Sequence, residues 1–241
     1  MKEISAMSVC TLYIGDITPY VRVISQHMVD WMHTLFVSGV FNIIAHLFAD
    51  ALKPAGGYQR YADYLQHWEW PKKMASTSQM RKICSPKRIR SNIDAHKMKG
   101  SASELLSVYS IFAHMAEEYV EMGVFKAAAT VLIKFAIIVD LLLMVPRGNV
   151  DPCTLHVAVT DFMAAVVMAF SVECLTPKFH QLQHLARQLF LHLMLLSCWV
   201  HERKHKMLKR YCQDVSNTCM FEEAVLGEVT IRPLIDLRTT P

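Results

Sequence analysis

Glycine and proline are scarce in this chain, with 8 and 9 residues among 241. Folds built from many short strands depend on these residues for their tight turns, so the composition argues against a β-sandwich or a β-barrel. Hydrophobic residues make up 53% of the chain, and in segments such as 20–52 they recur at the 3.6-residue helical period. The sequence therefore predicts an all-α fold, a single helical domain of about seven or eight helices with little or no sheet.

Regularly spaced cysteine pairs are also missing. The chain has seven cysteines, an odd number, and no two of them form a C-x-x-C motif. Small secreted proteins stabilised by disulfides need an even and regular set, so this class is excluded. We expect reduced thiols in an intracellular protein.

Long hydrophobic runs without charge are absent as well. The best candidate for a membrane span is the segment 124–145, but Lys126, Lys134 and Asp140 fall inside it. A charged side chain near the centre of a span costs roughly 3 kcal/mol. We therefore expect a helix buried in protein, with its charges at an edge, and no membrane partner.

Turn-forming residues and changes in composition divide the chain into four parts. In chain order these are an N-terminal helical segment (1–70), a basic connector (71–100), a helical core (101–231) with a basic helix at 199–214, and a tail (232–241). Within them, Gly39 indicates close packing or a break between two helices, and Ser101 or Ser103 suits a helix N-cap. Pro152 and Pro177 suit the first position of a helix.

Positive charge is concentrated in two stretches. The segment 72–99 carries nine Lys and Arg residues against one acid, and 201–210 carries five against one, although the net charge is only +4. Clusters of cations on an otherwise acidic chain favour a surface that faces a polyanion such as DNA. A solvated surface without a ligand is the alternative. The candidate phosphate-binding residues of the second stretch are Arg203, Lys204, Lys206, Lys209 and Arg210.

The same stretch contains a literal H-E-x-x-H motif at 201–205. On a helix, His201 and His205 share one face and are candidate zinc ligands, with Glu202 as a general base. The cations within and after the motif oppose the binding of a dication, and no histidine or cysteine follows at a spacing that completes the site. The alternative is a pair of polar histidines on a basic helix.

Three groups of motifs carry a resemblance to a known family. The first is Asp30-Trp-Met-His33 followed by Ser38-Gly39, and the second runs from Lys99 to Tyr109. The third comprises Thr176-Pro-Lys-Phe-His180, His184-Leu185, Ser197 to Lys206, Lys209-Arg-Tyr211, Asn217-Thr218, Phe221-Glu222 and Glu228-Val-Thr230. Over residues 27–238 the chain resembles transposase-like proteins encoded by eukaryotic DNA transposons. It looks like the helical C-terminal part of a longer protein, in a truncated or domesticated copy.

The resemblance implies a nuclear, ribonuclease-H-like enzyme that cuts DNA with two divalent metal ions. Such chemistry needs three acidic side chains on a mixed sheet. Asp30 and Glu202 lie inside matched motifs and are the candidate catalytic carboxylates, with His180 and His184 nearby in the third group. The chain lacks the strand-rich half that carries the first carboxylates, so we expect it to be catalytically incomplete on its own.

These observations lead to one hypothesis and two alternatives. The hypothesis is a transposon-derived fragment that binds DNA without sequence preference, with a divalent metal ion as the only cofactor implied. The alternatives are a zinc-dependent hydrolase that uses the motif at 201–205, and a helical interaction protein without a ligand. The sequence assigns neither an oligomeric state nor a DNA target.

Overall fold

The computed structural model describes residues 28–70 and 80–199. The chain divides after Leu196 into two units, and the described residues lie almost entirely in the first. Within these ranges there are eight α-helices, four short 3₁₀ helices and no strand, and the only β-type pairing is an isolated bridge between Asp30 and Leu196. The predicted all-α fold is confirmed. The helices are α2 (Trp31–Phe36), α3 (Val40–Ala51), η1 (Lys53–Ala55), α4 (Tyr58–His67), η2 (Lys82–Cys84), α6 (Pro86–Asp94), α7 (Ala102–Glu121), α8 (Lys126–Met144), η3 (Val145–Arg147), α9 (Pro152–Phe170), η4 (Val172–Cys174) and α10 (Pro177–His192).

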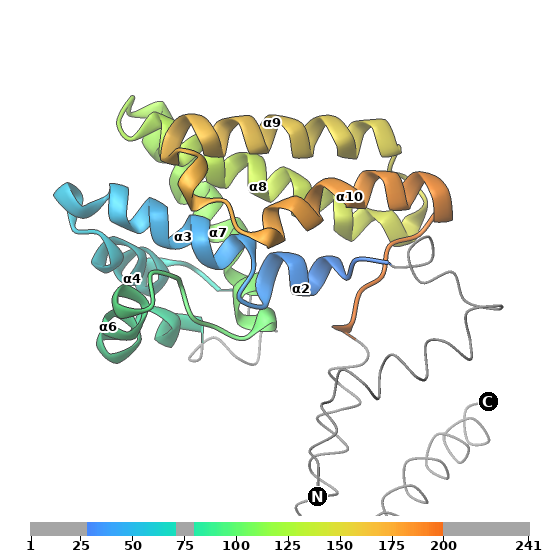
Figure 1. Cartoon of the computed structure of the whole chain (residues 1–241). Coiled ribbons are helices and arrows are strands. Elements are labelled where there is room, and N and C mark those ends of the chain that lie inside the picture. The colour runs from blue at the N-terminus through green and yellow to red at the C-terminus, as the bar shows by residue number, and fades with distance from the viewer. Residues whose placement is uncertain (1–27, 71–79, 200–241) are drawn as a thin grey trace, which may run out of the picture. The chain divides into compact units, whose positions relative to one another are not determined.

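The four longest described helices, with 16 to 20 residues each, are α7 to α10. From α7 to α10, each helix packs against the next one along the chain, while α3 lies against α8 and α2 lies against α7 and α10 (Figure 1). The shorter helices α4 and α6 lie together with η2, and α4 also contacts α3 and α7. The helices that precede the basic connector (α2, α3 and α4) thus share one core with the helices that follow it.

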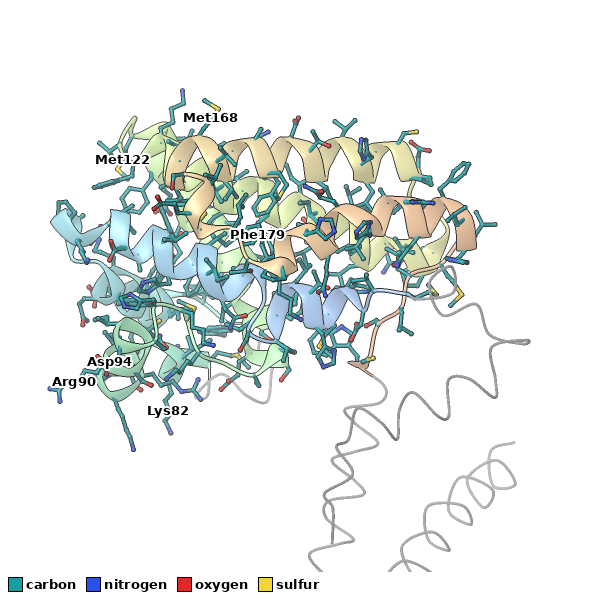
Figure 2. All side chains as sticks on the ribbon, in the orientation of Figure 1. Lys82, Arg90, Asp94, Met122, Met168 and Phe179 are labelled. Atoms are coloured by element: carbon teal, nitrogen blue, oxygen red, sulfur yellow. The ribbon has the colours of Figure 1, made fainter. Side chains whose placement is uncertain are left out.

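A continuous row of aromatic rings joins the helices. It starts with Tyr61 of α4, whose ring stacks on Phe112 of α7 at 4.2 Å between centroids, and Phe41 of α3 stacks on Phe135 of α8 at 5.1 Å. The row ends at Phe179 of α10, which lies at the centre of the view in Figure 2. Each such ring buries roughly 150–250 Å² and so contributes strongly to the hydrophobic stabilisation of the core. The members of the row are Tyr61, Phe112, Phe41, Phe135, Phe162 and Phe179.

The charges within the apolar helix α8 lie at its edges, as predicted. Asp140 is exposed and accepts a 2.6 Å hydrogen bond from the hydroxyl of Tyr109, and Lys134 forms a 3.3 Å ion pair with Asp161 of α9. Burial, followed by this hydrogen bond to the carboxylate, raises the pKa of the Tyr109 hydroxyl. The polar groups of α8 therefore face neighbouring helices and solvent while Phe135 and its apolar neighbours fill the core.

Gly39 is both a break and a point of close packing. The helical period predicted over 20–52 is interrupted between α2 and α3, and Gly39 is the N-cap of α3. A Cβ atom at this position would lie 2.3 Å from the carbonyl oxygen of Thr34, so no larger residue fits without a shift of the backbone. The part of the predicted helix before residue 28 lies outside the described residues.

The last described helix ends earlier than the sequence suggests. The pattern predicts a helix from Thr176-Pro177 to Cys198 and allows an irregularity within it. In the structure α10 ends at His192, and Leu193 takes a left-handed conformation with φ 55°. This turn brings Leu196 back to α2, where its carbonyl oxygen accepts a hydrogen bond from Trp31 N–H at 3.2 Å. The return to α2 is a tertiary contact that helical periodicity does not encode.

Three described segments are long and apolar enough to cross a membrane by length and composition alone: Trp31–Ala51, Lys126–Arg147 and Pro152–Phe170. The most apolar window of the first segment is 72% buried inside the protein, and that of the third only 22%. The outer face of the third segment, α9, mixes exposed polar residues such as His156 and Asp161 with the apolar Met168. That no membrane is involved remains a prediction.

Candidate functional site

The first basic stretch is folded from Arg81 to Lys99. It consists of η2, α6 and the loop that leads to α7, and it carries seven Lys and Arg residues against the single acid Asp94. The rest of the described chain carries seven cations against twelve acids. In Figure 2 the side chains of Lys82 and Arg90 extend away from the helices on one side of the molecule. We call residues 81–99 the basic segment.

The basic segment is held to the core by a few buried side chains. Ile83 and Cys84 of η2 and Asn92 of α6 are buried. Burial raises the pKa of the Cys84 thiol to about 12, so this side chain packs as an apolar group and is a poor nucleophile at neutral pH. These anchors direct the exposed cations outward.

The loop before α7 is fixed by two asparagines from different helices. Asn92 Oδ1 accepts a 2.8 Å hydrogen bond from Lys99 N–H. Asn42 of α3 donates through Nδ2 to the carbonyl oxygen of Met98 at 2.7 Å, and Met98 N–H donates to the Asn42 carbonyl at 2.8 Å. Because the backbone is bonded on both sides, Lys99 and Gly100 have defined positions relative to α6.

A cavity of about 420 Å³ opens between the end of α6 and the start of α7. This is within the size range of small-molecule sites. Its wall contains three side chains with N–H donors (Arg88, Asn92 and Lys99), two serines and one carboxylate, Glu104. The residues that line it are Arg88, Ser91, Asn92, Lys99, Gly100, Ser101 and Glu104.

The carboxylate of Glu104 is fully engaged by groups of the protein. Its Oε1 accepts from Arg88 Nη2 at 3.1 Å, and its Oε2 accepts from Ser101 N–H at 2.8 Å. Ser101 Oγ in turn accepts from Glu104 N–H at 3.3 Å, which completes a capping box at the N-terminus of α7. Burial acts to raise the pKa of Glu104, but the hydrogen bonds from Ser101 and Arg88 together outweigh it and the pKa is lowered.

Two donor atoms of residues that line the cavity are left without a partner. Among the described residues, Arg88 Nη1 and the Nδ2 amide of Asn92 are buried and have no hydrogen-bond partner. The amide of Asn92 cannot be reversed to relieve this, because its oxygen must face the N–H of Lys99. A buried donor without a partner costs about 1–3 kcal/mol. A ligand that accepts hydrogen bonds from these two donors would remove that cost.

Asp30 is the predicted catalytic residue that the structure describes. It is the N-cap of α2, where its Oδ1 accepts from Met32 N–H at 3.0 Å and its other oxygen contacts the ring of His33. The side chain is 12% exposed. These bonds give Asp30 a structural role at the start of a helix, and its catalytic role remains a prediction.

His180 and His184 lie one turn apart on the exposed side of α10. Their Nε2 atoms are 3.1 Å apart and their rings are nearly perpendicular. At this distance a ring N–H of one histidine can donate to a ring nitrogen of the other, so the pair needs no metal ion to explain its geometry. The sequence favours two histidines that anchor the helix through hydrogen bonds over a pair of metal ligands, and a role in catalysis remains a prediction.

The other predicted site residues lie outside the described residues. They are His201, Glu202, Arg203, Lys204, His205, Lys206, Lys209 and Arg210. The zinc motif, the second candidate carboxylate and the second basic stretch therefore remain predictions.

Sequence reasoning missed the cavity. The Ser101-x-x-Glu104 spacing is a visible signal for a capping box, and Ser101 is one of the two predicted N-caps. Asn92 carries no signal, because a polar residue in a basic helix is ordinarily exposed. Its burial depends on the contact between α6 and the loop before α7.

Comparison with known proteins gives no further assignment. No protein-family model, no curated protein and no solved structure matches the chain.

Proposed function

We propose that this chain is a transposon-derived nuclear protein that binds duplex DNA through phosphate contacts, without sequence preference and without cutting activity of its own. The proposed lack of cutting activity rests on the resemblance, because ribonuclease-H-like chemistry needs three acidic side chains and only Asp30 and Glu202 lie inside matched motifs. The nuclear location and the transposon origin rest on the motif resemblance. DNA binding has support from the charge distribution of the described residues.

One observation carries the proposal of DNA binding. Among the described residues, only Arg88 of the seven cations in the basic segment forms an ion pair, with Glu104. Exposed cations without acidic partners are free to approach phosphate groups, and such contacts supply non-specific affinity. Five of the seven are exposed: Arg81, Lys82, Lys87, Arg90 and Lys99.

The test measures the affinity of the full chain for a short DNA duplex at increasing salt concentrations. Replacing Lys82, Lys87 and Arg90 by Gln should weaken binding and reduce the slope of log K against log salt by up to about 3, roughly one for each phosphate group that is no longer neutralised. A matched variant replaces Lys126, Arg147 and Arg187, which are exposed elsewhere in the described chain, and should keep the slope. Equal slopes in the two variants would contradict the proposal.

A further inference from the structure

The cavity at the start of α7 has the chemistry of an anion site. Its unpaired groups, Arg88 Nη1 and Asn92 Nδ2, are both donors, and Lys99 adds a cation whose Nζ donates to Ser91 Oγ at 2.7 Å. The only acid on its wall, Glu104, already accepts bonds from Arg88 and Ser101 on both oxygens. A ligand with several oxygen acceptors would therefore complement these donors.

The N-terminus of α7 adds a second contribution. This helix has 20 residues, so its first turn carries a partial positive charge and points N–H groups toward an anion. The capping box satisfies the amides of Ser101 and Glu104, whereas those of Ala102 and Ser103 have no partner within the helix. Asn92 is a second observation, because it is fully buried, lies on a different helix, α6, and its Nδ2 has no hydrogen-bond partner.

The backbone at this site is held in place before any ligand arrives. Gly100 lies on the cavity wall, and a Cβ atom added there would be 3.1 Å from the side chain of Leu105. The loop is thus packed tightly against the core, while Asn92 and Asn42 bond Lys99 and Met98 on either side of it. Preorganised donors of this kind bind an anion without further ordering.

We propose that the cavity formed by Arg88, Asn92, Lys99 and the first turn of α7 binds a phosphate-type oxyanion. The donors of Arg88 and Asn92 and the ammonium group of Lys99 bond its oxygens, and the partial positive charge at the start of α7 adds to the attraction. The proposal goes beyond non-specific DNA binding, because it assigns one discrete site that also takes inorganic phosphate.

The first experiment is a titration of the full chain with inorganic phosphate, followed by ¹H–¹⁵N NMR. The side-chain amide of Asn92 and the backbone amides of Gly100, Ser101 and Ala102 should shift in a saturable way. Sodium chloride at matched ionic strength is the control and should leave these signals unsaturated. Shifts no larger with phosphate than with chloride would overturn the proposal.

Matched variants separate the cavity from general positive charge. Lys99→Gln removes a cation from the cavity and should weaken phosphate binding about tenfold, or about 1.4 kcal/mol. Lys87→Gln removes the same charge from an exposed position on α6 that does not line the cavity, and binding should change by less than about twofold. Equal weakening in both variants would overturn the proposal.

A third variant tests the buried amide. Asn92→Asp keeps the oxygen that accepts from Lys99 N–H but replaces the unpaired donor by a second oxygen, so phosphate should no longer saturate. If this variant fails to fold, Arg88→Lys provides the test of the site instead. It keeps a positive charge near Glu104 but lacks the planar fork of donors, and it should weaken phosphate binding while circular dichroism stays helical. Undiminished binding in the folded variant would count against the site.

Free phosphate and the phosphate of a DNA backbone share this chemistry, and a duplex distinguishes them. If DNA uses the cavity, a duplex shifts the Asn92 amide and phosphate competes with it. If only free phosphate uses it, the duplex leaves that signal unchanged, and the oxyanion site stands. If DNA binds but neither DNA nor phosphate shifts the Asn92 signal, the oxyanion site is wrong and the proposed function stands. If phosphate saturates the site but DNA does not bind, the proposed function is wrong and the oxyanion site stands.

Discussion

The side-chain oxygen of Asn92 accepts a hydrogen bond from the backbone N–H of Lys99 at 2.8 Å. This one bond orients the amide of Asn92, so that its NH₂ group remains unpaired on the wall of a cavity. It also fixes the loop that ends at the capping box of Ser101 and Glu104. The most basic part of the described chain is therefore joined to a helix N-terminus by a partly buried hydrogen bond.

Glu104 should give the protein a stability that depends on pH. Its pKa in the folded state is lowered, so its contribution to the free energy of unfolding is complete above the pKa of an unfolded glutamate, about 4.3. That contribution is lost as the pH falls through the lower folded value. Glu104→Gln should therefore cost about 1 kcal/mol at pH 7 and less in acid. Urea unfolding at several pH values measures this.

The control for that prediction is Glu121→Gln, at the exposed end of the same helix. It removes an equal charge without touching the capping box, so the difference from the unmodified chain should not follow the same pH profile. A destabilisation by Glu104→Gln that is constant between pH 7 and pH 3 would show that the carboxylate charge is not responsible.

Phe135 should be among the most costly positions to truncate. Its ring is 1% exposed and lies within 6.0 Å, between centroids, of Phe36, Phe41 and Phe162. Phe135→Ala removes contacts with three other helices and leaves a void, at a cost of about 3–5 kcal/mol. Ile137→Ala on the same helix is 48% exposed in the unmodified chain and should cost less than about 1 kcal/mol. Chemical denaturation monitored by circular dichroism would compare them, and similar midpoints would contradict the packing described.

Gly39→Ala should destabilise the junction of α2 and α3. The added methyl group would lie 2.3 Å from the carbonyl oxygen of Thr34 and 2.6 Å from the carbonyl carbon of Leu35. Relief requires movement of backbone, so we expect a loss of at least about 2 kcal/mol in the free energy of unfolding. Ser110→Ala changes an exposed position on α7 and should stay within about 0.5 kcal/mol. A Gly39→Ala variant as stable as Ser110→Ala would show that the backbone at this junction moves at little cost.

The apolar helix α8 should not anchor the protein in a membrane. Phe135 and its neighbours on α8 face other helices, and the charges of Lys134 and Asp140 meet partners from α9 and α7. We expect the expressed chain to be released from membranes by alkaline extraction. Quantitative retention in the membrane fraction after that treatment would contradict this prediction.

The second basic stretch allows a test of both sequence hypotheses for 201–210. Neutralising Arg203, Lys206 and Lys209 together should weaken duplex binding and lower the salt slope by up to about 3. Unchanged affinity in a folded variant would favour a solvated surface. If Glu202→Gln abolishes a metal-dependent nicking activity while DNA binding persists, Glu202 is catalytic and the expected inactivity is wrong. Zinc retained after purification would instead favour the hydrolase.

The sequence by itself determined the helical class and most helix positions. Local chemistry acts over a few residues, so Pro152 and Pro177 mark the first positions of α9 and α10 as predicted, and Ser101 caps α7. The concentration of cations before α7 was equally visible, because charge is a property of composition. These features need no knowledge of which segments meet.

Only the tertiary structure decided which polar residues are buried and where. Asn92 is fully buried because α6 packs beside the loop before α7, and helical periodicity contains no information on that neighbour. The early end of α10 has the same origin, since the return of Leu196 to Trp31 is a contact between residues far apart in the chain. The residues that line the cavity lie close together in the chain, from Arg88 to Glu104, but which of their donors become buried depends on how α6, the loop and α7 pack, so residue spacing alone could not reveal it.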